Sequence, residues 1–162
     1  MDLHNLGQMD GVLRLMYELP VTPIFEMPVK LDKDAFLPER AHATDAGADI
    51  FTPVGFKVPA FGKAIVHTGV HIQLPPNTVG MVKSKSGLNL FHDIITEGVI
   101  DEGFTNEIVV KLYNMGPAEY EFLPGDKITQ LVVMPVYYPH MKQVQEIEGG
   151  ERGDAGYGST GR

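Results

Sequence analysis

The sequence predicts an all-β domain of the sandwich, jelly-roll or barrel type. Two observations carry this prediction: short segments in which apolar and polar residues alternate, and turn-forming residues between those segments. The clearest alternation runs over residues 64–74, where Val66, Val70 and Ile72 fall on one face of the expected strand. The turn formers are frequent, since 12 prolines and 18 glycines are spread over the 162 residues.

The other strands are expected from the same pattern, in chain order at Val29–Leu31, Ala48–Phe51, Val79–Val82, Glu107–Asn114, Tyr120–Leu123 and Lys127–Val136. Turn signals separate them at residues 75–77, 115–117 and 123–126. Within the last of these, Asp126 is expected to serve the turn itself. The body of the domain is therefore predicted to span residues 23–148.

The two ends of the chain differ from this body. Residues 1–22 form an expected N-terminal extension whose apolar residues follow roughly helical spacing, although Gly7 and Gly11 weaken a short helix there. Residues 149–162 are rich in glycine and too poor in aliphatic side chains to fold alone. Composition by itself favours a disordered tail, but a mobile arm that closes over a ligand would use the same cation, aromatic ring and hydroxyls.

Composition limits the classes of partner. A net charge of −8 disfavours stable binding to nucleic-acid backbones. The absence of cysteine excludes a disulfide scaffold and thiolate metal sites. No apolar run has membrane-spanning length, and the N-terminus lacks signal-peptide features. We therefore expect a cytoplasmic protein without a membrane partner, which needs local cations, backbone N–H groups or a metal ion to bind a phosphate ester.

Five segments rich in Gly, Ser, Asp and Lys or Arg stand out in a fixed order: 43–50, 83–88, 98–104, 125–131 and 152–161. Each alone is a weak signal, whereas five in order at suitable separations are a strong one. With these segments the sequence resembles the trimeric dUTPase family over residues 41–161. The resemblance implies a distorted jelly-roll (β-clip) fold, a homotrimer with an exchanged C-terminal arm, and Mg²⁺-assisted hydrolysis of dUTP to dUMP and pyrophosphate.

Lys85, Ser86 and Gly87 combine a cation, a hydroxyl and a glycine, which suits a turn whose N–H groups bind phosphate. Taken alone, an ordinary turn with solvated lysines is the better interpretation. The resemblance implies phosphate binding by all three residues, with Lys85 where the family usually has arginine, so the bidentate fork is lost while the charge stays. It also implies phosphate contacts from Gln130, Arg152, Ser159 and Thr160.

Asp101 is the candidate general base, placed between an apolar run and a predicted turn at residues 102–103. The alternative is an aspartate that caps its own turn. The resemblance implies that Asp101 activates the attacking water and holds the sugar 3′-hydroxyl. It further implies that Phe104 packs on deoxyribose and leaves no room for a 2′-hydroxyl, and that Tyr157 stacks over uracil.

Residues 92–98 are interpreted as a hairpin that binds uracil, largely through backbone groups. Mispairing a buried polar group costs about 1–3 kcal/mol, so backbone pairing would discriminate against cytosine. The nucleoside-binding residues expected here are Ile95, Thr96, Gly98 and Ile100, in addition to Asp101 and Phe104.

Asp49 matches the family's first-motif aspartate, which implies a contact to Mg²⁺ through water. The alternative is a surface carboxylate at a strand edge. A histidine-bound metal is rejected, because His67 and His71 would stand about 13 Å apart along one strand.

Two other functions remain open at this point. A dCTP deaminase of the same fold needs a catalytic glutamate in the strand after Asp101, where this chain has Lys111. A non-catalytic nucleotide-sensing regulatory protein need not keep Asp101. The first alternative would release ammonia from dCTP, and the second would bind dUTP without turnover.

Overall fold

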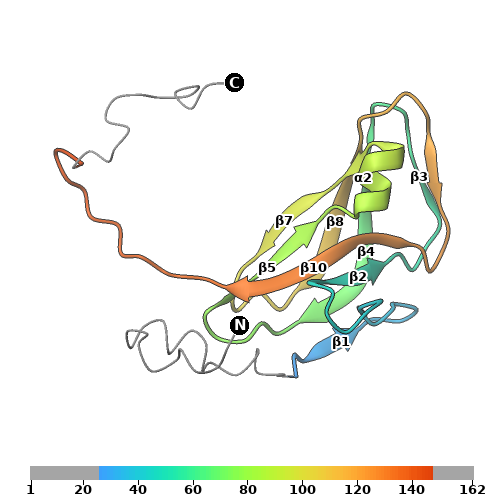
Figure 1. Ribbon diagram of the computed structural model, residues 1–162. Coiled ribbons are helices and arrows are strands. Elements are labelled where there is room, and N and C mark those ends of the chain that lie inside the picture. Colours follow the sequence, from blue (N-terminus) through green and yellow to red (C-terminus); the bar gives the residue numbers. More distant parts are fainter. Residues whose placement is uncertain (1–25, 148–162) are drawn as a thin grey trace, which may run out of the picture.

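The computed structural model describes residues 26–147, which form a β domain with one short helix (Figure 1). The expected N-terminal extension and the glycine-rich segment with Arg152, Tyr157, Ser159 and Thr160 lie outside these residues. In chain order the elements are β1 (Val29–Leu31), β2 (Gly47–Phe51), β3 (Phe56–Val58), β4 (Lys63–Ile72), β5 (Thr78–Lys83), α2 (Ser86–His92), β6 (Ile94–Ile95), β7 (Glu97–Ile100), β8 (Glu107–Asn114), β9 (Tyr120–Phe122) and β10 (Lys127–Pro135).

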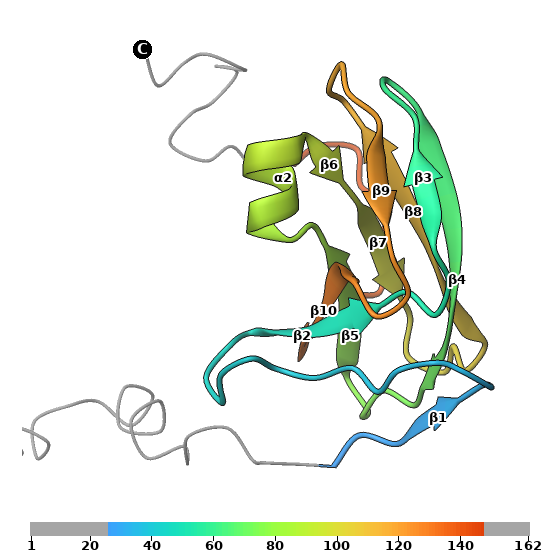
Figure 2. The ribbon, with the colours of Figure 1, turned by 90° about the vertical axis from the view of Figure 1, so that its right-hand side faces the viewer.

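The strands form two four-stranded sheets and a small ribbon, all antiparallel. The first sheet has the order β1-β4-β8-β6, the second β2-β10-β5-β7, and β3 pairs with β9. Figure 2 shows the long strands β4 and β8 on one side of the domain and β2, β5 and β10 on the other. Buried side chains of both sheets, such as Val110 from the first and Leu131 from the second, join one hydrophobic core. The predicted all-β class is confirmed.

The alternation that predicted the strands is also the burial pattern. Val66, Thr68, Val70 and Ile72 of β4 are buried, while the residues between them are more exposed, apart from Gly69. In β8 every second residue from Ile108 is buried. Period-2 patterning thus fixes which face of each strand enters the core.

Gly69 interrupts the pairing of β4 with β8. Its φ of 66° is in the left-handed region, and the register shifts between His67 and His71. The Gly69 N–H donates to Glu107 Oε1 over 2.9 Å. The two histidines then contact different carboxylates: His67 Nδ1 lies 2.8 Å from Glu107 Oε2, and His71 Nε2 lies 3.0 Å from Asp32 Oδ2.

Two local predictions are wrong. Residues 86–92 form helix α2 where a turn was expected, because Leu88 is buried against the core and tertiary packing stabilises a helix too short to form alone. Residues 92–98 are not a hairpin. Asp93 ends α2 in the left-handed conformation, β6 then pairs with β8 in the first sheet, and β7 pairs with β5 in the second. This segment crosses between the sheets. The sequence analysis also missed β3.

No helix within residues 26–147 has the length and apolar content needed to cross a membrane.

Candidate active site

A row of polar residues crosses the second sheet. The register pairs Asp49 of β2 with Gln130 of β10, Gln130 with Lys83 of β5, and Lys83 with Glu97 of β7. Cross-strand partners have their Cβ atoms about 5 Å apart, so the four side chains are neighbours on the sheet. Antiparallel pairing therefore gathers residues from three of the motif segments, and Glu97 directly precedes a fourth.

At one end of this row lies a lysine cluster, which we define as Asp49, Lys85 and Lys127. The Asp49 side chain is only 9% exposed, and it forms ion pairs with Lys85 and with Lys127, whose Nζ is 2.7 Å from Asp49 Oδ2. Burial raises the pKa of Asp49, but hydrogen bonds from the two lysines outweigh it, so the pKa lies below its ordinary value. The hydrogen bond with Asp49 raises the pKa of Lys127. The interpretation of Asp49 as a surface carboxylate is wrong.

The lysine cluster itself carries two positive charges and one negative charge, and the carboxylates of Glu39 and Asp45 lie near enough to Lys127 to raise its pKa further. Such a cluster favours an anion over a free metal ion. The sequence analysis did not single out Lys127 as a site residue. Its role was visible only once β10 was paired with β2, which sets Lys127 opposite Phe51 and beside Asp49.

The residues predicted to bind phosphate meet at this end of the sheet. Gln130 Nε2 donates to the carbonyl oxygen of Ser84 over 2.9 Å, which fixes the amide beside the exit of β5. Lys85 precedes α2 in extended conformation, and Ser86 and Gly87 begin the helix with exposed side-chain positions. A Cβ added at Gly87 would meet no atom within 4 Å, so the approach to this first turn is open.

The segment that crosses between the sheets is held next to the cluster. Ser84 Oγ donates to the carbonyl oxygen of Thr96 and accepts from its N–H, both over 2.9 Å. The Thr96 side chain is buried, and its hydroxyl has no hydrogen-bond partner within the described part of the chain. Ile100 packs in the core and Gly98 lies against Val82. A ligand could therefore reach Ile100 only through its backbone.

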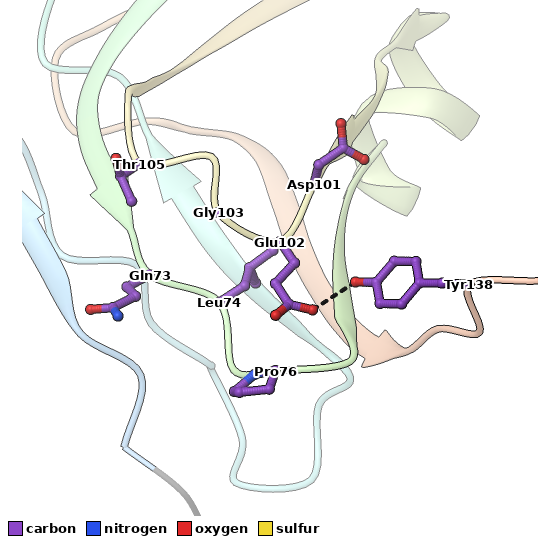
Figure 3. Close-up of a pocket in the computed structure, with 8 residues that line it drawn as sticks. All are labelled: Gln73, Leu74, Pro76, Asp101, Glu102, Gly103, Thr105 and Tyr138. Atoms are coloured by element: carbon purple, nitrogen blue, oxygen red, sulfur yellow. Dashed lines mark hydrogen bonds between the residues drawn. The ribbon is translucent and has the colours of Figure 1, made fainter.

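Asp101 lies at the far end of β7, at the rim of an open hollow of about 680 Å³ that is lined by Gln73, Leu74, Pro76, Asp101, Glu102, Gly103, Thr105 and Tyr138 (Figure 3). The Asp101 side chain is exposed, and Phe104 N donates to its carbonyl oxygen over 3.1 Å. Gly103 completes this tight turn with a φ of 87°. Phe104 is 41% exposed, so it is not a core aromatic.

Within one chain, the candidate base Asp101 lies apart from the residues predicted to bind phosphate. Asp101 follows Ile100, which pairs with Gly80, whereas the lysine cluster lies beyond the Lys83–Glu97 pair. Asp101 lies four residues along the chain from Glu97, which corresponds to about 13 Å at strand spacing. The structure brings Asp49, Lys85, Ser86, Gly87 and Gln130 together, and places Asp101 and Phe104 at the opposite end.

The site suits a magnesium ion that arrives on phosphate groups. Within residues 26–147 no three His, Asp or Glu side chains gather in a way that could hold a metal ion. Mg²⁺ keeps most of its waters and binds proteins through few carboxylates when phosphates supply other ligands. A carboxylate has about four acceptor positions, so Asp49 can bind both lysines and still accept from a metal-bound water. The donor set therefore fits Mg²⁺ held through water.

The Lys111 ammonium lies over the Tyr113 ring, 5.0 Å from its centroid. No carboxylate stands at the strand position where a deaminase of this fold would need one.

Comparison with known proteins gives one consistent family. The family model of dUTPase matches residues 33–161. The deoxyuridine 5′-triphosphate nucleotidohydrolase of Clostridium kluyveri is 41% identical over 135 residues, which cover 82% of this chain and 94% of that protein.

Solved structures agree. A variant dUTPase of Staphylococcus bacteriophage 80alpha, solved with dUpNHpp, superposes with a TM-score of 0.76 at 32% identity, covering 85% of this chain and 99% of that one. A variant dUTPase of phage phi11 of S. aureus, whose structure details the coordination of a structural Mg(II) ion, gives a TM-score of 0.71 at 28% identity, covering 77% of this chain and 100% of that one. Because the family model matches most of the chain, this protein belongs to the dUTPase family.

Proposed function

We propose that this chain hydrolyses dUTP to dUMP and pyrophosphate with Mg²⁺, which limits uracil incorporation into DNA and supplies dUMP for dTMP synthesis. The observation that carries the proposal is the lysine cluster beside Ser86 and Gln130, which gathers two cations, a hydroxyl and an amide where the motifs predict phosphate binding. The deoxyuridine 5′-triphosphate nucleotidohydrolase of Clostridium kluyveri and the phage dUTPase solved with dUpNHpp support the choice of substrate.

Asp101 would accept a proton from the water that attacks the α-phosphorus in line. Lys85, Ser86 and Gln130 would stabilise the charge that develops on the phosphate oxygens, because fixed donors act most strongly where charge grows in the transition state. Mg²⁺, when bound, would neutralise charge on the triphosphate, and Asp49 would contact it through water. Phe104 would pack on the deoxyribose.

The segments outside residues 26–147 complete the proposal. Arg152, Ser159 and Thr160 would bind the terminal phosphates, and Tyr157 would stack over uracil in the segment predicted to be a mobile arm. Uracil itself would pair with the backbone around Ile95, Thr96 and Gly98. These roles stay predictions, as does the cytoplasmic location.

We also propose that the active form is a homotrimer in which one site uses more than one chain. Asp101 lies four residues along the chain from Glu97, whose cross-strand partner is Lys83, and this corresponds to about 13 Å of strand. That separation is longer than the reach of one water molecule, which supports a site that takes Asp101 and the lysine cluster from different chains. Exposed apolar side chains on three strands, Val99, Val109 and Met134, offer surface for contacts between copies. Analytical ultracentrifugation measures the assembly directly.

The first test measures pyrophosphate release from dUTP, dCTP and UTP with Mg²⁺, for the unmodified protein and for Asp101→Asn. We expect release from dUTP alone, lost in the variant. Ammonia from dCTP would indicate a deaminase instead, and tight binding of dUTP without release would indicate a nucleotide sensor.

A second test asks whether the site is shared. Asp101→Asn and Ser86→Ala chains, each inactive alone, are unfolded together and refolded into mixed assemblies. If Asp101 and Ser86 serve a site from different chains, some mixed sites contain both native residues and activity returns. If both came from one chain, every site would lack one of them and no activity would return.

A further inference from the structure

Glu102, next to the candidate base, joins three segments of the chain. Its Oε2 accepts a hydrogen bond from the backbone N–H of Asn77 over 2.8 Å and another from the Tyr138 hydroxyl over 2.7 Å (Figure 3 shows the second). Asn77 lies in the turn before β5, and Tyr138 lies three residues after the end of β10. One carboxylate oxygen therefore connects the turn after β7 to the start of one strand and the exit of another.

These contacts close a ring. The N–H of Val136 donates to the carbonyl oxygen of Asn77 over 3.0 Å, so the exit of β10 is bound to the Asn77 turn independently of Glu102. Asn77 adopts a positive φ of 58°, which restricts this turn further. Because Val136 already joins this exit to the Asn77 turn, the Glu102 carboxylate bridges two segments that lie side by side.

The two adjacent acidic residues differ in what they do. Within residues 26–147 the Glu102 carboxylate accepts two hydrogen bonds, whereas the Asp101 carboxylate makes none and points away from Glu102 (Figure 3). The Asp101 backbone is nevertheless held, by the Ile100–Gly80 pair on one side and by the Phe104 N–H on the other. Asp101 is thus a carboxylate free to bind water on a turn that its neighbour anchors.

We propose that Glu102 is a positioning residue for the hydrolysis, with Tyr138 as its partner: together they hold the turn that sets Asp101 toward the attacking water. This rests on the proposed role of Asp101. The Tyr138 hydrogen bond, followed by that of Asn77, lowers the pKa of Glu102, and the bond with Glu102 raises the pKa of Tyr138. Both groups therefore keep the protonation states that the bond needs at neutral pH.

The test compares Tyr138→Phe with Tyr137→Phe. The first variant removes only the hydroxyl that donates to Glu102, and the second removes the same group from a neighbour that is 93% exposed. Since a misplacement near 1 Å can cost about 100-fold in rate, we expect kcat for dUTP to fall roughly tenfold in Tyr138→Phe. The KM for dUTP and the thermal midpoint of Tyr138→Phe should stay unchanged. The Tyr137→Phe variant should keep the kcat of the unmodified protein. Glu102→Gln should lower kcat in the same direction.

The decisive measurement combines substitutions. If Tyr138 acts through Asp101, adding Tyr138→Phe to Asp101→Asn lowers the residual single-turnover rate no further, because the two effects are not additive. An equal extra loss in that background would overturn the proposal, as would unchanged kcat in Tyr138→Phe. A raised KM with unchanged kcat would also overturn it, since the bond would then serve substrate binding. If Asp101→Asn itself stayed active, the proposed function would fail first.

Discussion

Asn114, a buried amide at the end of β8, allows the sharpest prediction of stability. Its Nδ2 donates to the carbonyl oxygens of Val58, over 3.1 Å, and Ala118, over 2.7 Å, while its Oδ1 accepts from Gly116 N–H over 2.9 Å. In the ladder Asn114 also pairs with Ile94 of β6. The side chain thus ties β3 to the β8–β9 turn, while the backbone of the same residue pairs with the segment that crosses between the sheets.

The magnitude for Asn114→Ala follows from which partners water can reach. Ala118 is exposed, so its carbonyl oxygen can bond to solvent, whereas Val58 and Gly116 are buried. A buried group left without a partner costs about 1–3 kcal/mol, so two such groups, with a small cavity, lower the free energy of unfolding by about 4 kcal/mol. For a chain of this size that corresponds to a fall in thermal midpoint of about 8–16 °C.

The assay is urea and thermal unfolding at one fixed chain concentration, because assembly shifts apparent stability by mass action. Asn106→Ala is the matched control, since Asn106 is exposed. Asn114→Asp keeps the shape but turns a second oxygen toward two carbonyl groups, which would raise the pKa of the new carboxyl in the folded state. Its destabilisation should therefore grow as the pH rises from about 4 to 8. A loss in Asn114→Ala no larger than in Asn106→Ala would refute the reasoning.

Two further predictions concern the site. In Gly47→Ala the new Cβ would lie 2.1 Å from Gln130 Oε1, so the amide must leave Ser84 and kcat/KM for dUTP should fall roughly tenfold. Gly55→Ala is the control, because a Cβ there would have its nearest neighbour at 3.4 Å. Equal kcat/KM values in the two variants would contradict the assigned role of Gln130. Asp49→Asn should lower the free energy of unfolding at pH 7 by roughly 1–2 kcal/mol. This loss is smaller than that for breaking a fully buried ion pair, because both lysines stay partly exposed. Since the pKa of Asp49 is lowered on folding, this difference is present above about pH 3.8 and closes as the pH falls through the folded value, so a gap in urea midpoint that persists at pH 2 would count against the ion pairs.

The strands and their buried faces were predictable because the information is local. Ala64 to Leu74 and Glu107 to Asn114 alternate in the sequence itself, and a period of two leaves one choice of inward face. Turn chemistry is equally local, so the role of Asp126 was confirmed: its carboxylate accepts from Leu123 N–H over 2.7 Å. The identity of the family was also accessible, because its motifs are short segments in a fixed order.

Other features depended on contacts between distant residues. Helix α2 forms because Leu88 finds a place in the core, and residues 92–98 cross between sheets because β6 and β7 pair with strands of different sheets. Neither cause is visible in a short window of sequence.

The site shows the same division. The sequence by itself determined which residue types were available for phosphate chemistry, and it named Asp49, Lys85, Ser86, Gln130 and Asp101 from their motifs. Only the tertiary structure decided that Lys127 joins Asp49, that Glu102 bonds Tyr138, and that Asp101 lies at the end of β7 away from the Lys83–Glu97 pair. The physical reason is that ion pairs and strand register join residues far apart in the chain, and they exist only once the strands have paired.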